Sequence, residues 1–158
     1  MKRIMFVCHG NICRSPMAEF IFKYLLEKHG KSALYHVGSG ATSSEEIWNG
    51  IGNPVYPPAK AELAKHGISC NGKRAYQVRA SDYEQYDLFI VMDSANMRNM
   101  MRLFGNDPKQ KLRKLMNYAG KDRDVADPWY SDDFETAYND IYEGCAALLN
   151  DLIAGNES

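Results

Sequence analysis

The segment with the clearest chemical potential runs from Cys8 to Ser15 and reads Cys-His-Gly-Asn-Ile-Cys-Arg-Ser. The five residues between Cys8 and Arg14 are enough to wrap backbone N–H groups around a tetrahedral anion. The anion would then meet a helix N-terminus, where unpaired N–H groups and the helix dipole favour negative charge. The guanidinium of Arg14 can hold two phosphoryl oxygens, and the same positive surroundings favour a nucleophilic thiolate on Cys8. The segment predicts a phosphate-binding loop with a cysteine nucleophile.

The other residues of the loop fit this interpretation. Gly10 permits close backbone approach and unusual dihedral angles, and Asn11 is one of the few residues that tolerate a left-handed conformation. Ser15 can donate a hydrogen bond to the Cys8 sulfur, cap the following helix, or do both. A Cys-x5-Arg pattern alone occurs by chance in many proteins, so its place between a strand and a helix gives it weight. We assign to the phosphate-binding loop His9, Gly10, Asn11, Ile12, Cys13 and Arg14.

The elements that must position this loop alternate short apolar runs with helical periodicity, which is typical of an α/β protein with a parallel sheet. The apolar run 4–7 predicts a buried strand before the loop, and Ser15-Pro16 predicts the start of a helix that ends near His29. Ligands of open parallel sheets lie at the carboxyl ends of strands, which is where this loop falls. We also predict strands at 34–37, 88–92 and 111–115, helices at 59–66, 94–104 and 134–153, and irregular stretches at 38–58 and 117–133.

The bulk composition is that of one globular domain over residues 1–158, with 45% hydrophobic residues, 25% charged residues and a net charge of -1. This charge gives no support to nucleic-acid or membrane-surface binding. The N-terminal apolar run is too short for a signal peptide, and no run could span a bilayer. The four cysteines and four histidines show no metal-ligand spacing. We therefore expect free thiols, a cytoplasmic location and no metal.

The stretch from Val7 to Pro16 resembles the signature of the low-molecular-weight protein tyrosine phosphatases. The resemblance continues in order along nearly the whole chain, at Ser39-Gly40-Ala41, His66-Gly67-Ile68, Met92-Asp93-Ser94-Ala95-Asn96 and Asp127-Pro128-Trp129-Tyr130. It implies a three-layer α/β/α fold with a four-stranded parallel sheet, and the phosphate-binding loop between the first strand and the first helix. It further implies phosphotyrosine-containing protein substrates, a phosphocysteine intermediate on Cys8, and no cofactor.

The resemblance also places a general acid in a late Asp-Pro pair, which maps onto Asp127. A proton donor for the departing phenolate is worth ~10²–10⁴ in rate, and proline holds the preceding residue in extended backbone. In the second half-reaction, Asp127 is expected to act as a base on the attacking water. A second pair, Asp107-Pro108, has no match to the family and is interpreted as a turn.

Aromatic side chains near the acid predict the walls of a slot for a phenyl ring. Trp129 and Tyr130 follow Asp127 directly, and Trp48 lies in the long loop that we expect to face it. Tyr56 is interpreted either as a wall residue of this slot or as a residue that anchors the loop. The resemblance adds a sign of specificity at Ile12, because relatives that act on phosphoarginine carry threonine there.

Two further roles follow from the resemblance. Ser39 with Asn11 is similar to the family's network that supports the phosphate loop. Cys13 is implied to form a reversible disulfide with Cys8 under peroxide, although it can also be a loop residue packed inward. The chain departs from the family at Tyr56-Pro57-Pro58, where Asp-Pro-Arg is common, and at Lys73, where histidine is common. These departures leave substrate preference and part of the loop support open.

Two other functions stay open. A thioredoxin-coupled arsenate reductase uses the same fold and loop, but it needs two further cysteines close together, and only Cys70 and Cys145 remain. A non-catalytic phosphotyrosine-binding module is expected to lack Cys8 or Asp127, and both are present. The sequence favours the phosphatase over both.

Overall fold

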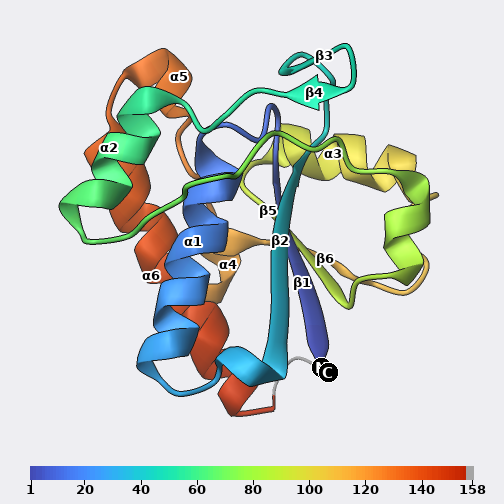
Figure 1. Ribbon diagram of the computed structural model, residues 1–158. Coiled ribbons are helices and arrows are strands. Elements are labelled where there is room, and N and C mark those ends of the chain that lie inside the picture. The colour runs from blue at the N-terminus through green and yellow to red at the C-terminus, as the bar shows by residue number, and fades with distance from the viewer. Residues whose placement is uncertain (156–158) are drawn as a thin grey trace.

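A computed structural model describes residues 1–155 of the chain, so residues 156–158 of the predicted domain lie outside the described part. Four parallel strands form the central sheet in the order β2-β1-β5-β6, which confirms the predicted sheet (Figure 1). A separate antiparallel pair is formed by β3 and β4. The strands are β1 (Lys2–Cys8), β2 (Tyr35–Ala41), β3 (Ile47–Trp48), β4 (Ile51–Gly52), β5 (Leu88–Val91) and β6 (Leu112–Lys114).

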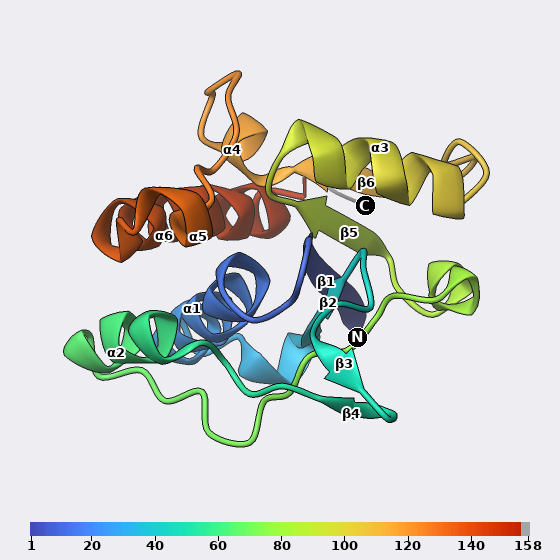
Figure 2. The same cartoon turned by 90° about the horizontal axis from the view of Figure 1, so that it is seen from above.

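Helices cover both faces of this sheet, so the predicted three-layer α/β/α architecture is confirmed (Figures 1 and 2). Helices α1 and α6 pack together on one face, with α2 and α4 against α6, while α3 lies over β5 and β6 on the other face. No helix among residues 1–155 is both long and apolar enough to cross a membrane. The helices are α1 (Arg14–Lys28), α2 (Pro57–Lys65), α3 (Ser94–Leu103), α4 (Leu115–Tyr118), α5 (Pro128–Ser131) and α6 (Phe134–Ile153).

Strand β1 is buried on both faces, which explains its continuous apolar run. Ile4 and Phe6 belong to the core beneath α1 and α6, while Met5 and Val7 belong to the second core beneath α3. Alternate side chains of a strand point to opposite faces, so each core takes every second residue. The strand that leads to Cys8 is therefore fixed from two sides.

Strand β2 runs four residues beyond the predicted end at Val37, as far as Ala41. All seven of its residues pair with β1. The sequence predicts an irregular stretch from residue 38, but Gly40 lies in the strand and allows a close approach there. A Cβ atom on Gly40 would lie 2.7 Å from Val78 Cγ2, so a larger residue would force a neighbour to shift. Glycine in this strand reflects packing rather than a turn.

The predicted irregular stretch 38–58 contains a small hairpin formed by β3 and β4. Its turn residues Asn49 and Gly50 have φ angles of 56° and 77°, which suit a two-residue hairpin turn. Helix α2 begins at Pro57, two residues before the predicted start. The short helices α4 and α5 fall within or beside the other predicted irregular stretch, because four residues are too few to show a helical period.

Candidate active site

The predicted phosphate-binding loop joins the end of β1 to the start of α1, so Cys8 is the last residue of the strand and Arg14 the first of the helix. The Cys8 sulfur accepts hydrogen bonds from the amide N–H groups of Asn11 and Ser15, each at 3.4 Å. It lies 3.1 Å from Ser15 Oγ. Ser15 does not cap α1, because the capping position is Cys13. The loop therefore surrounds the sulfur with hydrogen-bond donors.

The backbone of the loop leaves N–H groups for an anion. Across residues 1–155, the amides of Gly10, Ile12 and Cys13 donate to no protein acceptor. Asn11 has a φ of 59°, as predicted for a residue that tolerates the left-handed region. Gly10 has no positive φ, but a Cβ atom there would lie 3.3 Å from Glu46 Cγ. Glycine at position 10 therefore makes room for a close neighbour and does not serve an unusual φ angle.

A chain of buried polar groups supports the loop from below. Asn11 Nδ2 donates to Ser15 Oγ at 2.7 Å and to Ser39 Oγ at 2.9 Å. Asn11 Oδ1 accepts from the amide of Tyr76 at 3.0 Å. Ser39 Oγ in turn donates to Glu19 Oε1 at 2.6 Å. The predicted pair of Asn11 and Ser39 thus lies together beneath the loop.

Lys73 completes this support, although it stands where the family commonly has histidine. Its ammonium donates to the carbonyl oxygen of Ser39 at 3.0 Å and lies 3.5 Å from Glu19 Oε1. Burial lowers the pKa of Lys73, and the charge of Glu19 opposes that change. The sequence reasoning left the role of Lys73 open and missed Glu19. The sequence carries no signal for Glu19, because its burial in α1 becomes visible only in the structure.

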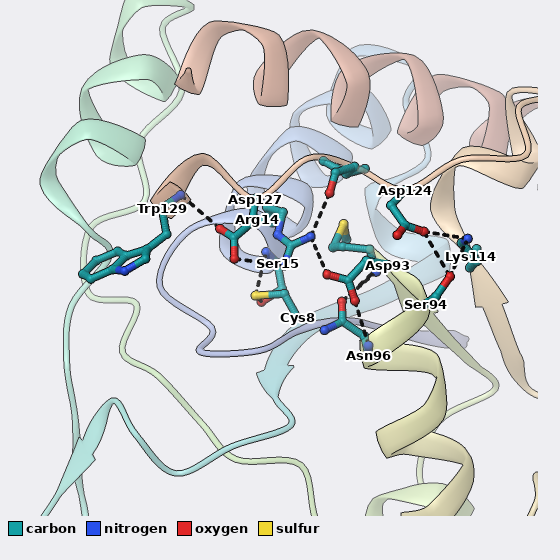
Figure 3. A network of polar contacts seen from close by, with 12 residues as sticks. Cys8, Arg14, Ser15, Asp93, Ser94, Asn96, Lys114, Asp124, Asp127 and Trp129 are labelled. Carbon is teal, nitrogen blue, oxygen red and sulfur yellow. Dashed lines mark hydrogen bonds and ion pairs between the residues drawn. The ribbon is translucent and has the colours of Figure 1, made fainter. Parts of the chain in front are cut away.

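Arg14 is buried, with 3% of its surface exposed, and it is held on three sides (Figure 3). Its Nη1 atom lies 2.9 Å from Asp93 Oδ2 and donates to the carbonyl of Val125 at 2.8 Å. Its Nη2 atom lies 3.5 Å from Asp127 Oδ2. Burial would lower the pKa of Arg14, but the negative charges of Cys8 and the two aspartates raise it. The guanidinium is therefore charged and fixed in orientation.

Asp127 lies in the extended backbone expected before proline, with φ of -80° and ψ of 111°. It caps α5, because its Oδ1 atom accepts from the amide of Trp129 at 3.0 Å. Its side chain is 27% exposed. One carboxylate oxygen thus fixes the local turn, while the other faces Arg14.

Cys8, Arg14 and Asp127 line one cavity of about 350 Å³. His9 and Glu45 form an exposed hydrogen bond at its rim, with 2.8 Å between Nε2 and Oε2. Trp48 does not line the cavity, which corrects the prediction, because it lies on the β3–β4 hairpin with 81% of its surface exposed. The lining residues are Cys8, His9, Gly10, Ile12, Cys13, Arg14, Glu45, Glu46, Asp127, Trp129 and Tyr130.

Tyr56 acts as an anchor for the wall rather than as part of it. Its ring centroid lies 4.9 Å from that of Trp129 and 6.0 Å from that of Phe134. Its amide donates to the carbonyl of Ile12 at 2.9 Å. Tyr56 therefore connects the phosphate loop to the aromatic wall from behind.

The remaining cysteines differ in their access to the site. Cys13 is buried and lines the cavity, and burial together with the nearby Cys8 raises its pKa to about 12. Neither Cys70 nor Cys145 lines the cavity. Cys145 is fully buried on α6, and that burial raises its pKa. All four thiols are free, and the arrangement offers no cysteine relay.

Asp107 shows what an Asp-Pro pair does away from a site. Its carboxylate accepts from the hydroxyl of Tyr83 at 2.5 Å and from the amides of Lys111 and Leu112. These bonds hold the turn between α3 and β6, as interpreted from the sequence. Within residues 1–155, no group of three or more His, Cys, Asp or Glu side chains is placed to hold a metal ion.

Asp93 was not predicted as a site residue, although its segment was part of the resemblance. It lies two residues after the end of β5, at the carboxyl edge of the sheet. A carboxylate there is near the ligand site of any open parallel sheet. That position, together with the Asp-x-x-Asn capping pattern of α3, was the signal that could have found it.

Comparison with known proteins agrees with this geometry. Residues 3–157 match the family described as low molecular weight phosphotyrosine protein phosphatase. The chain is 36% identical to the low molecular weight protein-tyrosine-phosphatase YfkJ of Bacillus subtilis over 94% of both chains. It is 35% identical to the human low molecular weight phosphotyrosine protein phosphatase, again over 94% of both.

Solved structures show the same fold. The crystal structure of YfkJ from Bacillus subtilis superimposes with a TM-score of 0.92 over 98% of this chain and 96% of that one. Vibrio vulnificus Wzb in complex with benzylphosphonate superimposes with a TM-score of 0.80 at 26% identity, over 93% of this chain and 96% of that one. The chain therefore belongs to the low molecular weight phosphotyrosine protein phosphatases, which are phosphoric monoester hydrolases.

Proposed function

We propose that the chain, acting as one domain, hydrolyses phosphotyrosine in proteins, and aryl phosphates in general, through a phosphocysteine intermediate on Cys8. One observation carries the proposal. Cys8, Arg14 and Asp127 line a single cavity that is also lined by the aromatic side chains of Trp129 and Tyr130. These residues supply a nucleophile, an anion clamp and a proton donor, the three groups that hydrolysis of phosphotyrosine uses.

In the first half-reaction, the loop amides and Arg14 bind the phosphate, and the Cys8 thiolate attacks phosphorus. The S–P bond forms as the P–O bond to the tyrosine breaks. Asp127, protonated at this stage, gives its proton to the departing phenolate oxygen. The negative charge that spreads over the three equatorial oxygens is stabilised by Arg14 and the amides, which are already oriented for it.

In the second half-reaction, Asp127 takes a proton from water, and that water attacks phosphorus. The S–P bond breaks, inorganic phosphate forms, and Cys8 leaves as a thiolate. Ser15 Oγ is 3.1 Å from the sulfur and accepts a bond from Asn11 Nδ2. Its hydroxyl donates to the carbonyl of Gly40 over a long 3.5 Å, and turning that hydrogen to the sulfur would stabilise the thiolate. Ser15 is thus proposed to assist the leaving of Cys8.

The substrate side chain fits the aromatic part of the cavity. Trp129 and Tyr130 line it, and Ile12 adds a further apolar side chain to the lining. Vibrio vulnificus Wzb, which has this fold, binds benzylphosphonate, a phosphonate that carries a phenyl ring. A cytoplasmic location fits the four free thiols.

The direct test is turnover of p-nitrophenyl phosphate and of a phosphotyrosine peptide by the wild-type chain in the presence of EDTA. We expect both to be hydrolysed with release of inorganic phosphate, because no step uses a metal. Binding of the peptide without turnover would instead favour the binding-module function. Arsenate turnover that depends on thioredoxin would favour the reductase.

Replacing Asp127 by asparagine tests the proton donor. For phenyl phosphate, whose leaving group is poor, we expect kcat/KM to fall by ~10²–10⁴, the usual worth of a general acid. For p-nitrophenyl phosphate the loss is expected to be much smaller, because nitrophenolate departs without a proton. Asp107→Asn is the matched control, since Asp107 lies in the other Asp-Pro pair, outside the cavity. Equal losses for both substrates would contradict the role of Asp127 as acid.

Cys13 is proposed to protect Cys8 from irreversible oxidation. Peroxide oxidises the Cys8 thiolate to a sulfenic acid, and attack by the Cys13 sulfur then forms a disulfide and releases water. Intact-mass analysis after mild peroxide should show a Cys8–Cys13 link that thiols reverse. A Cys13→Ala variant that keeps the same resistance to peroxide would rule out this protection.

A further inference from the structure

The segment that carries Asp127 is irregular, and it is held near its end by the backbone of Val125. Residues 119–127 connect α4 to α5 without forming a helix or a strand. The amide of Val125 donates to the carbonyl of Met92 at 2.9 Å, and its own carbonyl accepts from Arg14 Nη1 at 2.8 Å. Val125 is 1% exposed. The backbone two residues before the acid is thus attached to the end of β5 and to the phosphate-binding arginine.

The side chain of Asp124 forms a triangle of polar contacts beside this backbone (Figure 3). Asp124 Oδ1 lies 2.7 Å from Lys114 Nζ and accepts from Ser94 Oγ at 3.3 Å. Lys114 Nζ also donates to Ser94 Oγ at 3.2 Å. Ser94 begins α3 and Lys114 ends β6, so three separate parts of the chain meet at this point. The triangle ties the acid-bearing segment to the carboxyl edge of the sheet.

The ion pair is partly shielded from solvent. The side chain of Lys114 is 16% exposed and that of Asp124 is 44% exposed. Burial would raise the pKa of Asp124, but the hydrogen bond and charge of Lys114, with the bonds of Ser94, outweigh it and lower that pKa. The carboxylate therefore stays charged at neutral pH, and salt screens the pair less than it screens a fully exposed one.

The two segments joined by the triangle differ in how firmly they are held elsewhere. Asp93, which contacts Arg14, caps α3 by accepting from the amide of Asn96 at 2.7 Å. Asn96 Oδ1 accepts from the amide of Asp93 at 3.2 Å, which completes the cap. The acid-bearing segment has no such cap. Its side-chain pairs with α6, such as that of Arg123 with Asp140 at 2.9 Å, all lie before Asp124, and between Asp124 and Asp127 it is held by the backbone of Val125. Loss of the ion pair should therefore leave Asp93 and Arg14 in place and loosen the few residues that lead to Asp127.

We propose that Lys114 and Asp124 are positioning residues for the general acid, and that their ion pair sets the reach of Asp127 toward the leaving-group oxygen. Neither residue lines the active-site cavity, so they act through the backbone of residues 124–127. The inference rests on the proposed role of Asp127 as proton donor. A displacement of about 1 Å in a reacting group can cost on the order of 10²-fold in rate, so a modest shift of the segment is measurable.

The test compares Lys114→Met and Asp124→Asn with the wild-type chain on phenyl phosphate and p-nitrophenyl phosphate. We expect kcat/KM for phenyl phosphate to fall about tenfold, a part of the full effect of a general acid. The value for p-nitrophenyl phosphate and the inhibition constant of inorganic phosphate should change little, because Arg14 stays in place. Lys114→Arg keeps the charge and should restore most of the activity on phenyl phosphate.

Lys121→Met is the matched control. Lys121 lies in the same segment and pairs at 2.6 Å with Glu143, but the pair is exposed and joins the segment to α6 rather than to α3 and β6. We expect no leaving-group effect there. Two results for Lys114→Met would overturn this inference but not the proposed function. One is an equal loss on both substrates that accompanies a lowered Tm, and the other is no loss on either substrate. A wild-type chain that hydrolyses neither substrate would overturn the proposed function and this inference with it.

Discussion

Replacing Cys8 by serine is expected to reduce hydrolysis of a phosphotyrosine peptide to the background rate, a loss on the order of 10⁶-fold, as found when other hydrolases lose their nucleophile. Serine fits the same space beside Ser15 and Asn11, so the loop should keep its shape. A hydroxyl in these surroundings has no base to deprotonate it, whereas the thiol needs only the positive loop. The chemistry should therefore stop while the anion site remains.

Two measurements separate this result from simple unfolding. Isothermal titration with inorganic phosphate should show binding to Cys8→Ser, because the amides of Gly10, Ile12 and Cys13 and the Arg14 guanidinium are unchanged. Cys70→Ser is the control, since Cys70 is also buried but does not line the cavity, and it should retain full turnover. Turnover by Cys8→Ser within a few-fold of the wild-type rate would exclude a phosphocysteine.

The parts of the site that sequence predicted well are those whose chemistry and position coincide in a short segment. The loop from Cys8 to Arg14 combines a nucleophile, an anion clamp and a helix start within one stretch, so its fold follows from local rules alone. Asp127 needed the family resemblance, because nothing in an isolated Asp-Pro pair distinguishes it from Asp107. The structure separates them by the cavity that Asp127 lines and by the three hydrogen bonds that make Asp107 a turn residue.

What sequence reasoning missed depends on contacts between distant segments. Trp48 was taken for a wall because it is aromatic and lies in a facing loop, but the Asn49-Gly50 turn folds it into a hairpin that leaves it exposed. Glu19 and Lys73 lie far apart in the chain and meet only beneath the loop. Asp93 and Val125 contact Arg14 although both lie in the second half of the chain, far from it in sequence. Such contacts are decided by tertiary packing, which a local pattern does not encode.

The same contacts show that Arg14 has more than one task. It stands between two carboxylates, those of Asp93 and Asp127, which lie 2.9 Å and 3.5 Å from its guanidinium nitrogens. The fork must therefore hold the protein while it keeps donors for the phosphoryl oxygens. A compact ammonium has neither the plane nor the number of donors for both. The loop consequently depends on arginine rather than on positive charge alone.

Arg14→Lys and Arg14→Ala test this dependence. We expect Arg14→Ala to lower kcat/KM by about 10³–10⁵, the range measured for an arginine that stabilises a phosphoryl-transfer transition state. The loss should be equal for phenyl phosphate and p-nitrophenyl phosphate, because the charge on the equatorial oxygens develops with either leaving group. Arg14→Lys should recover only a small part of it.

The lysine variant also guards against a folding artefact. Removing the guanidinium entirely leaves Asp93 and Asp127 facing each other without a cation, so Arg14→Ala is expected to have a lower Tm. Arg14→Lys keeps a positive charge between them and should melt close to the wild type while remaining a poor enzyme. If Arg14→Lys instead retained nearly full activity, the planar fork would be unnecessary and charge alone would explain the site. A loss that appears only with phenyl phosphate would place Arg14 in proton transfer, and would overturn its assignment as the clamp on the phosphoryl group.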